Sequence, residues 1–342
     1  MNVIPVLEQA LPKTPIIQMN SHYAQNTIYV KRDDLLPFAF GGNKVRKAAE
    51  FYREIKKEQP DVIMTYGAEG SNHCRVIALM ACMMGLQCHI ISSASEIQKE
   101  ESSNRRMVLA TGASIETVPV EQVAETIDMR TNALRLEGKR VFFIQGGGHG
   151  KSGTEGYVKA YHEILSWEQE TGIVFDKIFH ASGTGATQAG LVCGELLTRS
   201  GEPARDSKDG NETRVTGISI ARSNPRGSRI VTESVRDYLG READRYEIDT
   251  AVEFTDAYTL GGYGYTNTEL TKLVAGLLRD ESLPLDHTYT GKAFYGMLRY
   301  LEEHNIRGQN ILFIHTGGTP LFYDDLDRIK SEALGQSEGA YT

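Results

Sequence analysis

The most informative stretch of the sequence is Lys31-Arg-Asp-Asp-Leu-Leu-Pro-Phe-Ala-Phe-Gly-Gly-Asn-Lys-Val-Arg-Lys47, in which Lys44 follows two glycines and an asparagine. The apolar residues after Lys44 recur with helical spacing, at Val45, Ala48, Ala49 and Tyr52. This spacing places Lys44 in the first turn of a helix, where the helix dipole disfavours a positive charge. Pressure to lose the proton favours a neutral amine, which Schiff-base chemistry requires. The flanking glycines favour close approach of a bound molecule over the alternative of a solvated surface lysine.

The composition is that of an ordinary globular chain with a net negative charge. A length of 342 residues exceeds one typical core and predicts two lobes. The net charge of -8, without a long basic run, argues against nucleic acid or an anionic membrane as a partner. No apolar stretch reaches membrane-spanning length, and no signal-peptide pattern is visible. The four cysteines lack metal-binding spacing, so we expect a cytoplasmic protein without a metal centre.

Short β-rich runs alternate with amphipathic helical runs from residue 61 onward. Strands that alternate with helices of this length predict an α/β fold with parallel strands and helices on both faces. The predicted strands cover residues 61–66, 87–92, 114–118, 141–144, 177–181 and 215–220. The predicted helices cover residues 71–84, 97–111, 121–137, 154–170 and 187–199. Residues 200–213 are polar and turn-rich, which predicts an exposed loop.

The segment Ala181-Ser-Gly-Thr-Gly-Ala-Thr-Gln-Ala-Gly190 joins a predicted strand to a predicted helix. In parallel α/β folds, ligands bind where strands end and helix N-termini point. Small residues let successive backbone N–H groups converge there, which suits a phosphate. The hydroxyls of Ser182, Thr184 and Thr187 favour an anion over a plain tight turn. The spacing departs from Gly-x-Gly-x-x-Gly, so a dinucleotide is poorly supported.

A second glycine-rich segment, Gln145-Gly-Gly-Gly-His-Gly-Lys-Ser152, is similar to a nucleotide-binding P-loop. Gln145 stands where that motif has its first glycine. No later strand ends in an evident magnesium-binding aspartate, so a nucleotide hydrolase is a weak alternative drawn from this loop alone.

The segment Gly67-Ala-Glu-Gly-Ser-Asn-His-Cys-Arg75 also joins a strand to a helix. Ser71 and Asn72 stand at the helix start, where they either cap the helix or present a hydroxyl and backbone N–H groups to a carboxylate. His73 is a weak candidate for a general base, and Cys74 is expected to be a small packing residue.

Further hydroxyl groups occur in the C-terminal half. Ile311-Leu-Phe-Ile-His-Thr-Gly-Gly-Thr-Pro320 is typical of a buried strand that ends at Thr316 and two glycines. Tyr263 and Tyr289 lie in glycine-containing segments, although buried tyrosines are mostly structural.

Taken in order, these motifs resemble pyridoxal-phosphate enzymes of fold type II, and specifically the family of D-cysteine desulfhydrase and 1-aminocyclopropane-1-carboxylate deaminase. The resemblance spans nearly the whole chain and implies two open, twisted, mostly parallel sheets flanked by helices, as in the tryptophan synthase β subunit. The motifs that carry it are Lys31-Arg-Asp-Asp-Leu35, Gly41-Gly-Asn-Lys-Val-Arg-Lys47, Ser71-Asn-His-Cys-Arg75, Ser182-Gly-Thr-Gly-Ala-Thr187, Gly262-Tyr-Gly264, Tyr289-Thr-Gly-Lys292 and His315-Thr-Gly-Gly318.

The resemblance implies a set of cofactor contacts. Lys44 would bind pyridoxal 5'-phosphate as a Schiff base and shuttle the proton at the substrate α-carbon. Asn72 would hydrogen-bond the phenolic oxygen of the cofactor, and Thr316 would face the pyridine nitrogen. The cofactor phosphate would be held by the segment after the strand, namely Ser182, Gly183, Thr184, Gly185, Ala186 and Thr187.

The resemblance also implies substrate contacts. Ser71 would contact the substrate carboxylate or assist proton transfer, and Asn72 and His73 would lie beside it. Tyr289, together with Tyr263, would approach the substrate side chain or the leaving group. His149 is a further candidate, because the loop that carries it would border the substrate pocket. His149 and Lys151 could bind an anionic or polar side chain of the substrate there. The alternative is that this loop is simply solvated.

Three departures bear on the reaction. A hydroxyl at Thr316 cannot keep a pyridine nitrogen protonated as a carboxylate can, so the cofactor would be a weaker electron sink, which favours β-elimination or β-replacement. The resemblance to the deaminase branch would imply Tyr-Glu-Gly-Lys and His-Leu-Gly-Gly at two of these motifs. This chain has Thr290 in place of the glutamate and Thr316 in place of the leucine, which favours the desulfhydrase branch. The segment Gly147-Gly-His-Gly-Lys-Ser-Gly153 departs from the usual Gly-Gly-Ser-Asn-Pro-Leu-Gly, and Thr266 replaces the usual proline, so the substrate need not be D-cysteine.

The sequence therefore predicts a lyase that carries out α,β-elimination on a small amino acid, with pyruvate, ammonia and sulfide as products from D-cysteine. The alternatives are β-replacement, ring opening of the cyclopropane acid, and a non-catalytic amino-acid-binding relative. We expect a large cofactor-binding domain from residues 1–45 and 152–342, a small domain from residues 46–151, and a homodimer as is usual in the family.

Overall fold

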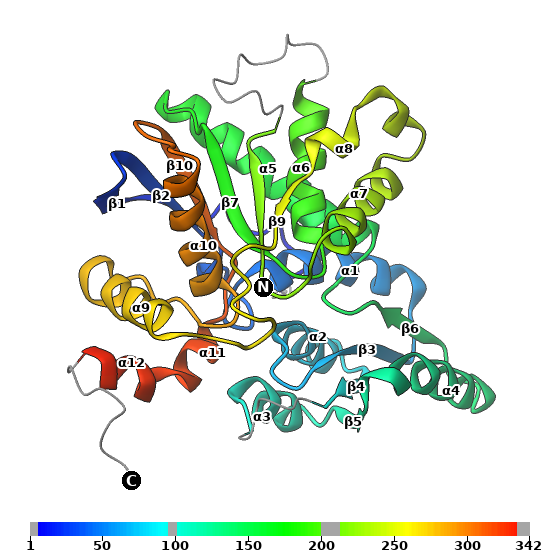
Figure 1. The fold of residues 1–342 in the computed structure, drawn as a ribbon. Coiled ribbons are helices and arrows are strands. Elements are labelled where there is room, and N and C mark those ends of the chain that lie inside the picture. The colour runs from blue at the N-terminus through cyan, green and yellow to red at the C-terminus, as the bar shows by residue number, and fades with distance from the viewer. Residues whose placement is uncertain (1–5, 95–100, 200–212, 334–342) are drawn as a thin grey trace, which may run out of the picture.

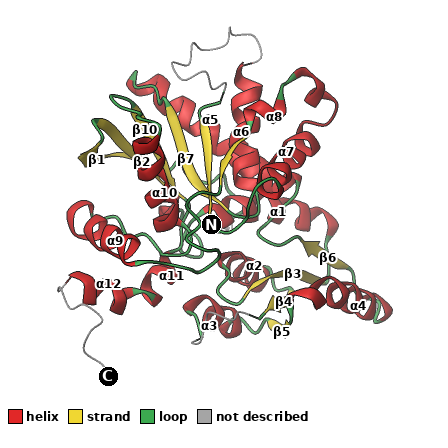
Figure 2. Cartoon of the chain, in the orientation of Figure 1, coloured by secondary structure: helices red, strands yellow, loops and turns green. Residues whose placement is uncertain are grey.

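The computed structural model describes residues 6–94, 101–199 and 213–333, which form two β-sheets with helices packed around them (Figure 1). Helices, red in Figure 2, lie on both sides of the larger sheet. Most of the predicted exposed loop at 200–213, and residues 97–100 of one predicted helix, lie outside the described residues. No helix within these ranges is long and apolar enough to cross a membrane.

The smaller sheet contains four parallel strands, as the sequence predicted. They are β3 (Val62–Ala68), β4 (Gln87–Ser93), β5 (Ser114–Val118) and β6 (Val141–Ile144), in the order β5-β4-β3-β6. β5 and β6 have the bounds that were predicted for them. Strands buried on both faces have continuous aliphatic runs, and the buried aliphatic residues on β3 and β4 explain why these strands could be predicted from the sequence.

The larger sheet has six strands, and one pair of them is antiparallel. Their order is β1-β2-β10-β7-β8-β9, with β1 antiparallel to β2 and the other pairs parallel. The strands are β1 (Ile16–Tyr23), β2 (Asn26–Arg32), β7 (Lys177–Ser182), β8 (Val215–Ser219), β9 (Glu253–Thr255) and β10 (Asn310–His315). The prediction missed β1, β2 and β9. β1 is an edge strand with only Met19 buried, so it lacks an apolar pattern, and β9 is three residues long.

The predicted helices appear with small shifts. They are α2 (Asn72–Met83), α3 (Ser103–Ala110), α4 (Val123–Leu136), α5 (Lys151–Thr171) and α6 (Ala186–Arg199). The helix after Lys44 is α1 (Asn43–Glu58). Six helices were not predicted individually, namely α7 (Arg226–Leu239), α8 (Ile248–Ala251), α9 (Thr268–Glu281), α10 (Thr290–Glu303), α11 (Thr319–Asp324) and α12 (Leu326–Ala333).

Three hydrophobic cores hold these layers together. One lies between the large sheet and α9 and α10, and a second lies on the opposite face beneath α5, α6 and α7. The third joins α1 and α2 to the small sheet. The strands of the small sheet all fall within residues 62–144, but α1 contacts α5 as well as α2, so the domain boundaries at 45 and 151 stay a prediction.

A buried carboxylate, Asp33, fixes the start of α1 against the rest of the molecule. It is completely buried and accepts hydrogen bonds from Thr14 Oγ1 at 2.7 Å, Arg46 Nε at 2.8 Å and the Tyr157 hydroxyl at 2.7 Å. Its backbone oxygen also accepts from Gly42 N at 2.7 Å. Asp33 follows β2, Arg46 lies on α1 and Tyr157 lies on α5, so one side chain joins three elements.

A second carboxylate completes this network. Glu163 on α5 accepts from Lys31 Nζ at 2.7 Å and from Arg46 Nη1 at 2.7 Å. Burial alone would raise the pKa of Asp33, but Arg46, Lys31 and the hydrogen bonds outweigh it and hold the pKa well below its ordinary value. Asp33 is therefore charged at neutral pH, and Arg46, Lys31 and its hydrogen-bond donors compensate this charge.

We expect Asp33→Asn to lower the free energy of unfolding by roughly 3 kcal/mol or more, because it leaves Arg46 buried with reduced compensation. Because folding depresses the pKa of Asp33, its contribution is present at neutral pH and is lost as acid protonates the carboxylate. The variant should therefore lose less additional stability than the wild type on acidification below about pH 5. Urea denaturation at several pH values measures both effects.

The matched control is Asp280→Asn, which removes an aspartate that pairs with Arg279 at the exposed surface. It should leave the urea midpoint nearly unchanged. Equal losses of stability in the two variants would contradict the role given to Asp33.

Candidate active site

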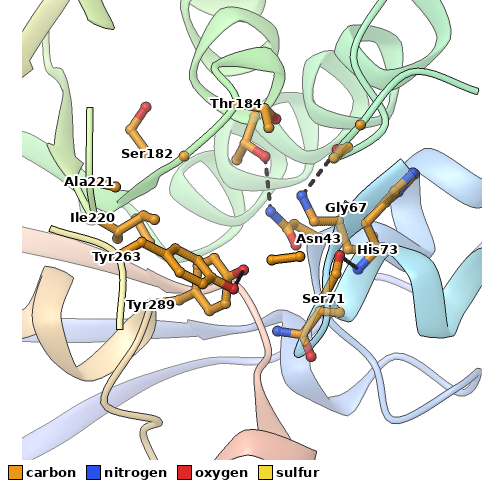
Figure 3. A pocket seen from close by; sticks show the side chains of 18 of the residues that line it. Asn43, Gly67, Ser71, His73, Ser182, Thr184, Ile220, Ala221, Tyr263 and Tyr289 are labelled. Atoms are coloured by element: carbon orange, nitrogen blue, oxygen red, sulfur yellow. Dashed lines mark hydrogen bonds between the residues drawn. The ribbon is translucent and has the colours of Figure 1, made fainter. Parts of the chain in front are cut away.

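A cavity of about 360 Å³ opens where strands of both sheets end (Figure 3). β3 contributes Tyr66 to Ala68, β7 contributes Ser182, and Ile220 and Thr316 follow β8 and β10. Four loops that the sequence analysis singled out separately therefore meet around one space. None of the described residues that line it is an aspartate or a glutamate, so this lining suits anions.

Lys44 reaches this cavity from the first turn of α1. The two glycines before the helix have φ values of 65° and 92°. A Cβ atom on Gly41 would lie 2.0 Å from Asp34 O, and one on Gly42 would lie 2.7 Å from Thr316 O. The glycines were expected to admit a bound molecule, but the groups that require glycine here are backbone atoms of the chain itself.

The amine of Lys44 donates a hydrogen bond to Gly147 O at 3.0 Å. Burial lowers its pKa to about 8, while Cys74 and Lys47 act in the opposite direction. The lowered pKa was predicted, but the cause is loss of hydration more than the helix dipole. A substantial fraction of the amine is thus neutral near neutral pH.

Lys47 is a second buried lysine, which the sequence analysis did not single out. Its Nζ lies 3.2 Å from the same Gly147 O, and its side chain is 1% exposed. Burial and the nearby Lys44 lower its pKa well below the ordinary value. Its place one helical turn after Lys44 was the available signal. A bound phosphate would compensate this buried amine.

The predicted phosphate segment forms the start of α6. Ser182, Gly183, Thr184, Gly185 and Thr187 line the cavity, whereas Ala186 is fully buried at the first helical position. Ser182 Oγ donates to Gln188 Oε1 at 2.9 Å, and Thr187 Oγ1 accepts from Asn43 Nδ2 at 3.0 Å. These hydroxyls hold the loop, so the backbone N–H groups of the helix start remain for an anion.

The start of α2 forms the opposite wall, where Figure 3 shows Ser71 and His73. Ser71 Oγ accepts from His73 N at 3.2 Å and from Cys74 N at 3.3 Å, so it caps the helix and keeps its own proton to donate. Asn72 Oδ1 accepts from Arg75 Nη2 at 3.2 Å and from Asn104 Nδ2 at 3.0 Å. Asn72 therefore has its NH₂ group to offer a ligand.

The two histidine candidates are placed differently. His73 lines the cavity, but its Nε2 lies 2.8 Å from Thr65 Oγ1, which itself donates to Ile144 O, so His73 is the donor. Burial lowers the pKa of His73 well below its ordinary value, so the ring is neutral. His149 does not line the cavity; its Nε2 lies 3.4 Å from Ser234 Oγ on α7.

Two tyrosines from distant segments meet on the remaining wall. The hydroxyls of Tyr263 and Tyr289 lie 2.8 Å apart, and both rings line the cavity (Figure 3). Burial raises the pKa of Tyr263 to about 12 and that of Tyr289 well above its ordinary value, so both phenols are protonated. Thr316, also on the cavity wall, is 7% exposed.

These groups fit pyridoxal phosphate. The start of α6 has no acidic residue in its first turn, Lys47 is a buried amine without a carboxylate partner among the described residues, and Lys44 supplies an amine of lowered pKa. Asn72 offers a donor, and Thr316 offers a hydroxyl. Within the described residues, no three His, Cys, Asp or Glu side chains gather as they would around a metal ion.

A lysine amine of lowered pKa beside an anion cradle, at the meeting point of two mostly parallel sheets, defines an enzyme that holds a phosphorylated carbonyl cofactor. The chain belongs to the family of pyridoxal-phosphate dependent enzymes, whose profile matches residues 7–317.

Individual relatives agree with this family. D-Cysteine desulfhydrase from Serratia proteamaculans is 30% identical over 337 residues, which cover 93% of this chain and 95% of the relative. D-Cysteine desulfhydrase from Yersinia enterocolitica is 29% identical, with the same coverage of 93% and 95%. The crystal structure of an ACC deaminase homologue superposes with a TM-score of 0.79 at 29% identity over 93% of both chains.

Cysteine synthase from Entamoeba histolytica shares the fold, with a TM-score of 0.61 at 16% identity over 99% of this chain and 97% of that one. The predicted fold class, the type II fold of pyridoxal-phosphate enzymes, is thereby confirmed, as is the predicted cofactor. The residue roles assigned from the resemblance stay predictions.

The lowered pKa of Lys44 can be tested in cofactor-free protein. We expect the rate of covalent uptake of pyridoxal phosphate to rise with pH and level off above a midpoint near 8, because the neutral amine is the reactive form. Stopped-flow absorbance between about pH 6 and pH 10 measures this rate. Lys44→Ala serves as the control without uptake. A midpoint at the ordinary lysine value of 10.5 would contradict the geometry.

Proposed function

We propose that the chain is a pyridoxal-phosphate-dependent lyase that eliminates a β-substituent from a small amino acid, with D-cysteine giving pyruvate, ammonia and sulfide. The observation that carries the proposal is a cavity that joins Lys44 to a pair of protonated tyrosines, with no carboxylate among the described residues that line it. The names of the D-cysteine desulfhydrase relatives, which align over 93% of this chain, support it.

The bound cofactor supplies an electron sink for the charge that develops at the substrate α-carbon. The start of α6 and Lys47 would hold its phosphate, and Asn72 would donate to its phenolic oxygen. Thr316 would offer the ring nitrogen a hydroxyl, which does not keep such a nitrogen protonated as a carboxylate can. The cofactor would then be a weaker electron sink, which favours prompt loss of a β-substituent over transamination.

Lys44 is the base at the α-carbon. Its amine, with a pKa lowered to about 8, is neutral often enough to take the α-proton and acidic enough to return it. Ser71 donates its hydroxyl proton to the substrate carboxylate, because both of its observed hydrogen bonds use Oγ as the acceptor. The backbone N–H groups at the start of α2 support the same carboxylate.

The tyrosine pair acts at the leaving group. Because their pKa values are raised by burial, Tyr263 and Tyr289 keep their protons at neutral pH and serve as donors to a departing sulfur. A phenol that stays protonated is a poor nucleophile, which favours elimination over attack on a cyclopropane ring.

The arrangement of domains and the cellular setting complete the proposal. Residues 1–45 and 152–342 form the large domain, and residues 46–151 form the small one, with the substrate between them. The protein works as a homodimer in the cytoplasm; the exposed side chains of Leu35 and Phe40, 55% and 54% accessible, support an apolar contact between copies.

The proposed function predicts that purified protein carries a visible absorbance band from bound cofactor and forms pyruvate from D-cysteine or β-chloroalanine. Lys44→Ala should lose the band of the covalent adduct and the activity, because Lys44 is the residue proposed to form that adduct. Lys56→Ala, which removes an exposed lysine from the same helix, is the control and should keep both. A colourless wild-type protein, or one that forms no pyruvate from any β-substituted alanine, would overturn the proposal.

The role of the tyrosine pair predicts that Tyr289→Phe lowers kcat for D-cysteine roughly 100-fold or more, because thiolate is a poor leaving group without a proton donor. The loss should be smaller for β-chloroalanine, since chloride leaves without a proton. Tyr265→Phe, half exposed on the same loop as Tyr263, is the control. Equal losses with both substrates would show that the pair does not act at the leaving group.

A further inference from the structure

Arg222 is a cation on the cavity wall for which none of the described residues supplies a counter-charge. It follows β8 and lines the cavity, and its Nη1 is enclosed by protein without a hydrogen-bond partner. Within the described residues, no hydrogen bond or ion pair joins its guanidinium to another side chain. Arg222 as a whole is half-buried, but a guanidinium nitrogen that is removed from water is usually paired, because its burial is costly otherwise. An unpaired one in a ligand cavity indicates that the ligand supplies the anion.

No carboxylate among the described residues pairs with Arg222. Burial lowers the pKa of Arg222, the Tyr66 hydroxyl acts in the opposite direction, and Arg226 adds to the lowering. None of the described residues that line the cavity is an aspartate or a glutamate. A guanidinium keeps its proton in proteins, so Arg222 stays a fixed positive charge.

The backbone that carries Arg222 is held in place from two sides. Ser219 Oγ accepts from Ala221 N at 3.2 Å and donates to Arg222 O at 2.6 Å. Lys292 Nζ donates to Ile220 O at 3.3 Å and to Gly262 O at 2.6 Å. Lys292 thereby ties the segment before Arg222 to the loop that carries Tyr263, so both belong to one wall.

The other anions of the proposed reaction have partners elsewhere. The cofactor phosphate has the start of α6 and Lys47, and the substrate carboxylate has the start of α2 with Ser71. Figure 3 shows Ile220 and Ala221, directly before Arg222, across the cavity from Ser71 and His73. The segment that carries Arg222 therefore lies across the cavity from the group proposed to hold the substrate carboxylate, which leaves the β-substituent of the substrate as the anion that Arg222 can bind.

We propose that Arg222 binds an anionic group on the β-carbon of the substrate, so that the substrate class is a β-substituted alanine whose leaving group is a sulfonate or a sulfate ester. This inference rests on the proposed elimination. The planar guanidinium matches two oxygens of such a group in a bidentate contact, and it stabilises the charge that grows as the group departs.

The reaction balances without an oxidant or reductant. The substrate loses its α-proton, and the Cβ–S bond of a sulfonate breaks with its electron pair on sulfur, which releases sulfite. For a sulfate ester, the Cβ–O bond breaks and sulfate leaves. The remaining 2-aminoacrylate shifts a proton to give 2-iminopropanoate, which takes up water and yields pyruvate and ammonium.

The test compares anionic and neutral leaving groups in the holoenzyme. The probes are both enantiomers of cysteate, serine O-sulfate and β-chloroalanine, with pyruvate, sulfite and sulfate as measured products. Wild-type protein should form pyruvate and sulfite from cysteate in equal amounts. In Arg222→Met, kcat/KM for cysteate relative to that for β-chloroalanine should fall roughly 10- to 100-fold, mainly through KM. Arg222→Lys should recover part of this ratio.

The matched control is Arg226→Met, which removes a neighbouring exposed charge that does not line the cavity. It should leave the ratio unchanged. A second readout that needs no turnover is competitive inhibition by ethanesulfonate, whose inhibition constant should rise in Arg222→Met by a similar factor. Circular dichroism confirms that each variant folds.

The possible failures are distinguishable. Pyruvate from β-chloroalanine but none from cysteate or serine O-sulfate would overturn this inference and leave the proposed elimination standing. No pyruvate from any probe would overturn both. An equal loss for all substrates in Arg222→Met would assign Arg222 to the α-carboxylate, and weaker binding of pyridoxal phosphate with an unchanged ratio would assign it to the cofactor phosphate; either result overturns the inference.

Discussion

The buried charge of Asp33 is the constraint on which the position of Lys44 depends. The reactive amine has to sit in the first turn of α1, and that turn is tied to β2 through Asp33 O and Gly42 N. The same carboxylate binds Arg46, two residues after Lys44, and the Tyr157 hydroxyl on α5. A purely apolar contact would allow α1 to shift along its axis. Charge-assisted hydrogen bonds in several directions restrict both this shift and the rotation of the helix about its axis. The position of Lys44 is therefore set by a group outside the cavity.

The cavity itself has the opposite electrostatics. Residues at the starts of α2 and α6 line it together with Lys44, and none of the described lining residues is an aspartate or a glutamate. Lys44 and Lys47 share one carbonyl oxygen, and both have lowered pKa values. In the proposed function, the cofactor phosphate would raise the pKa of Lys47 again. Cofactor binding would then be coupled to the charge of this lysine, since a buried amine is stabilised by a counter-ion.

Local sequence patterns were sufficient for the parts of the fold in which burial repeats regularly. The parallel strands of the small sheet and the helices α2, α4, α5 and α6 follow from apolar spacing and glycine stops. β1 could not be found this way, because an edge strand exposed to water needs no apolar alternation. The loops of the site were found through their glycines and hydroxyls. Lys47 and Arg222 were missed, because their importance comes from the absence of partners, which only the folded structure shows.

The residues that depart from the family pattern differ in how close they lie to the cavity and in what they contact. His149 lies behind the start of α6 and contacts Ser234, so the unusual loop around it acts on the cofactor cradle more directly than on the substrate. Thr290 donates to Asp286, which also accepts from Tyr289 N at 2.7 Å, so that position orients a tyrosine. Lys292 donates to carbonyl oxygens in both the segment before Arg222 and the loop that carries Tyr263, so these two segments are held together. In the proposed reaction, charge recognition by Arg222 and proton donation by the tyrosine pair would therefore come from elements that one buried lysine joins.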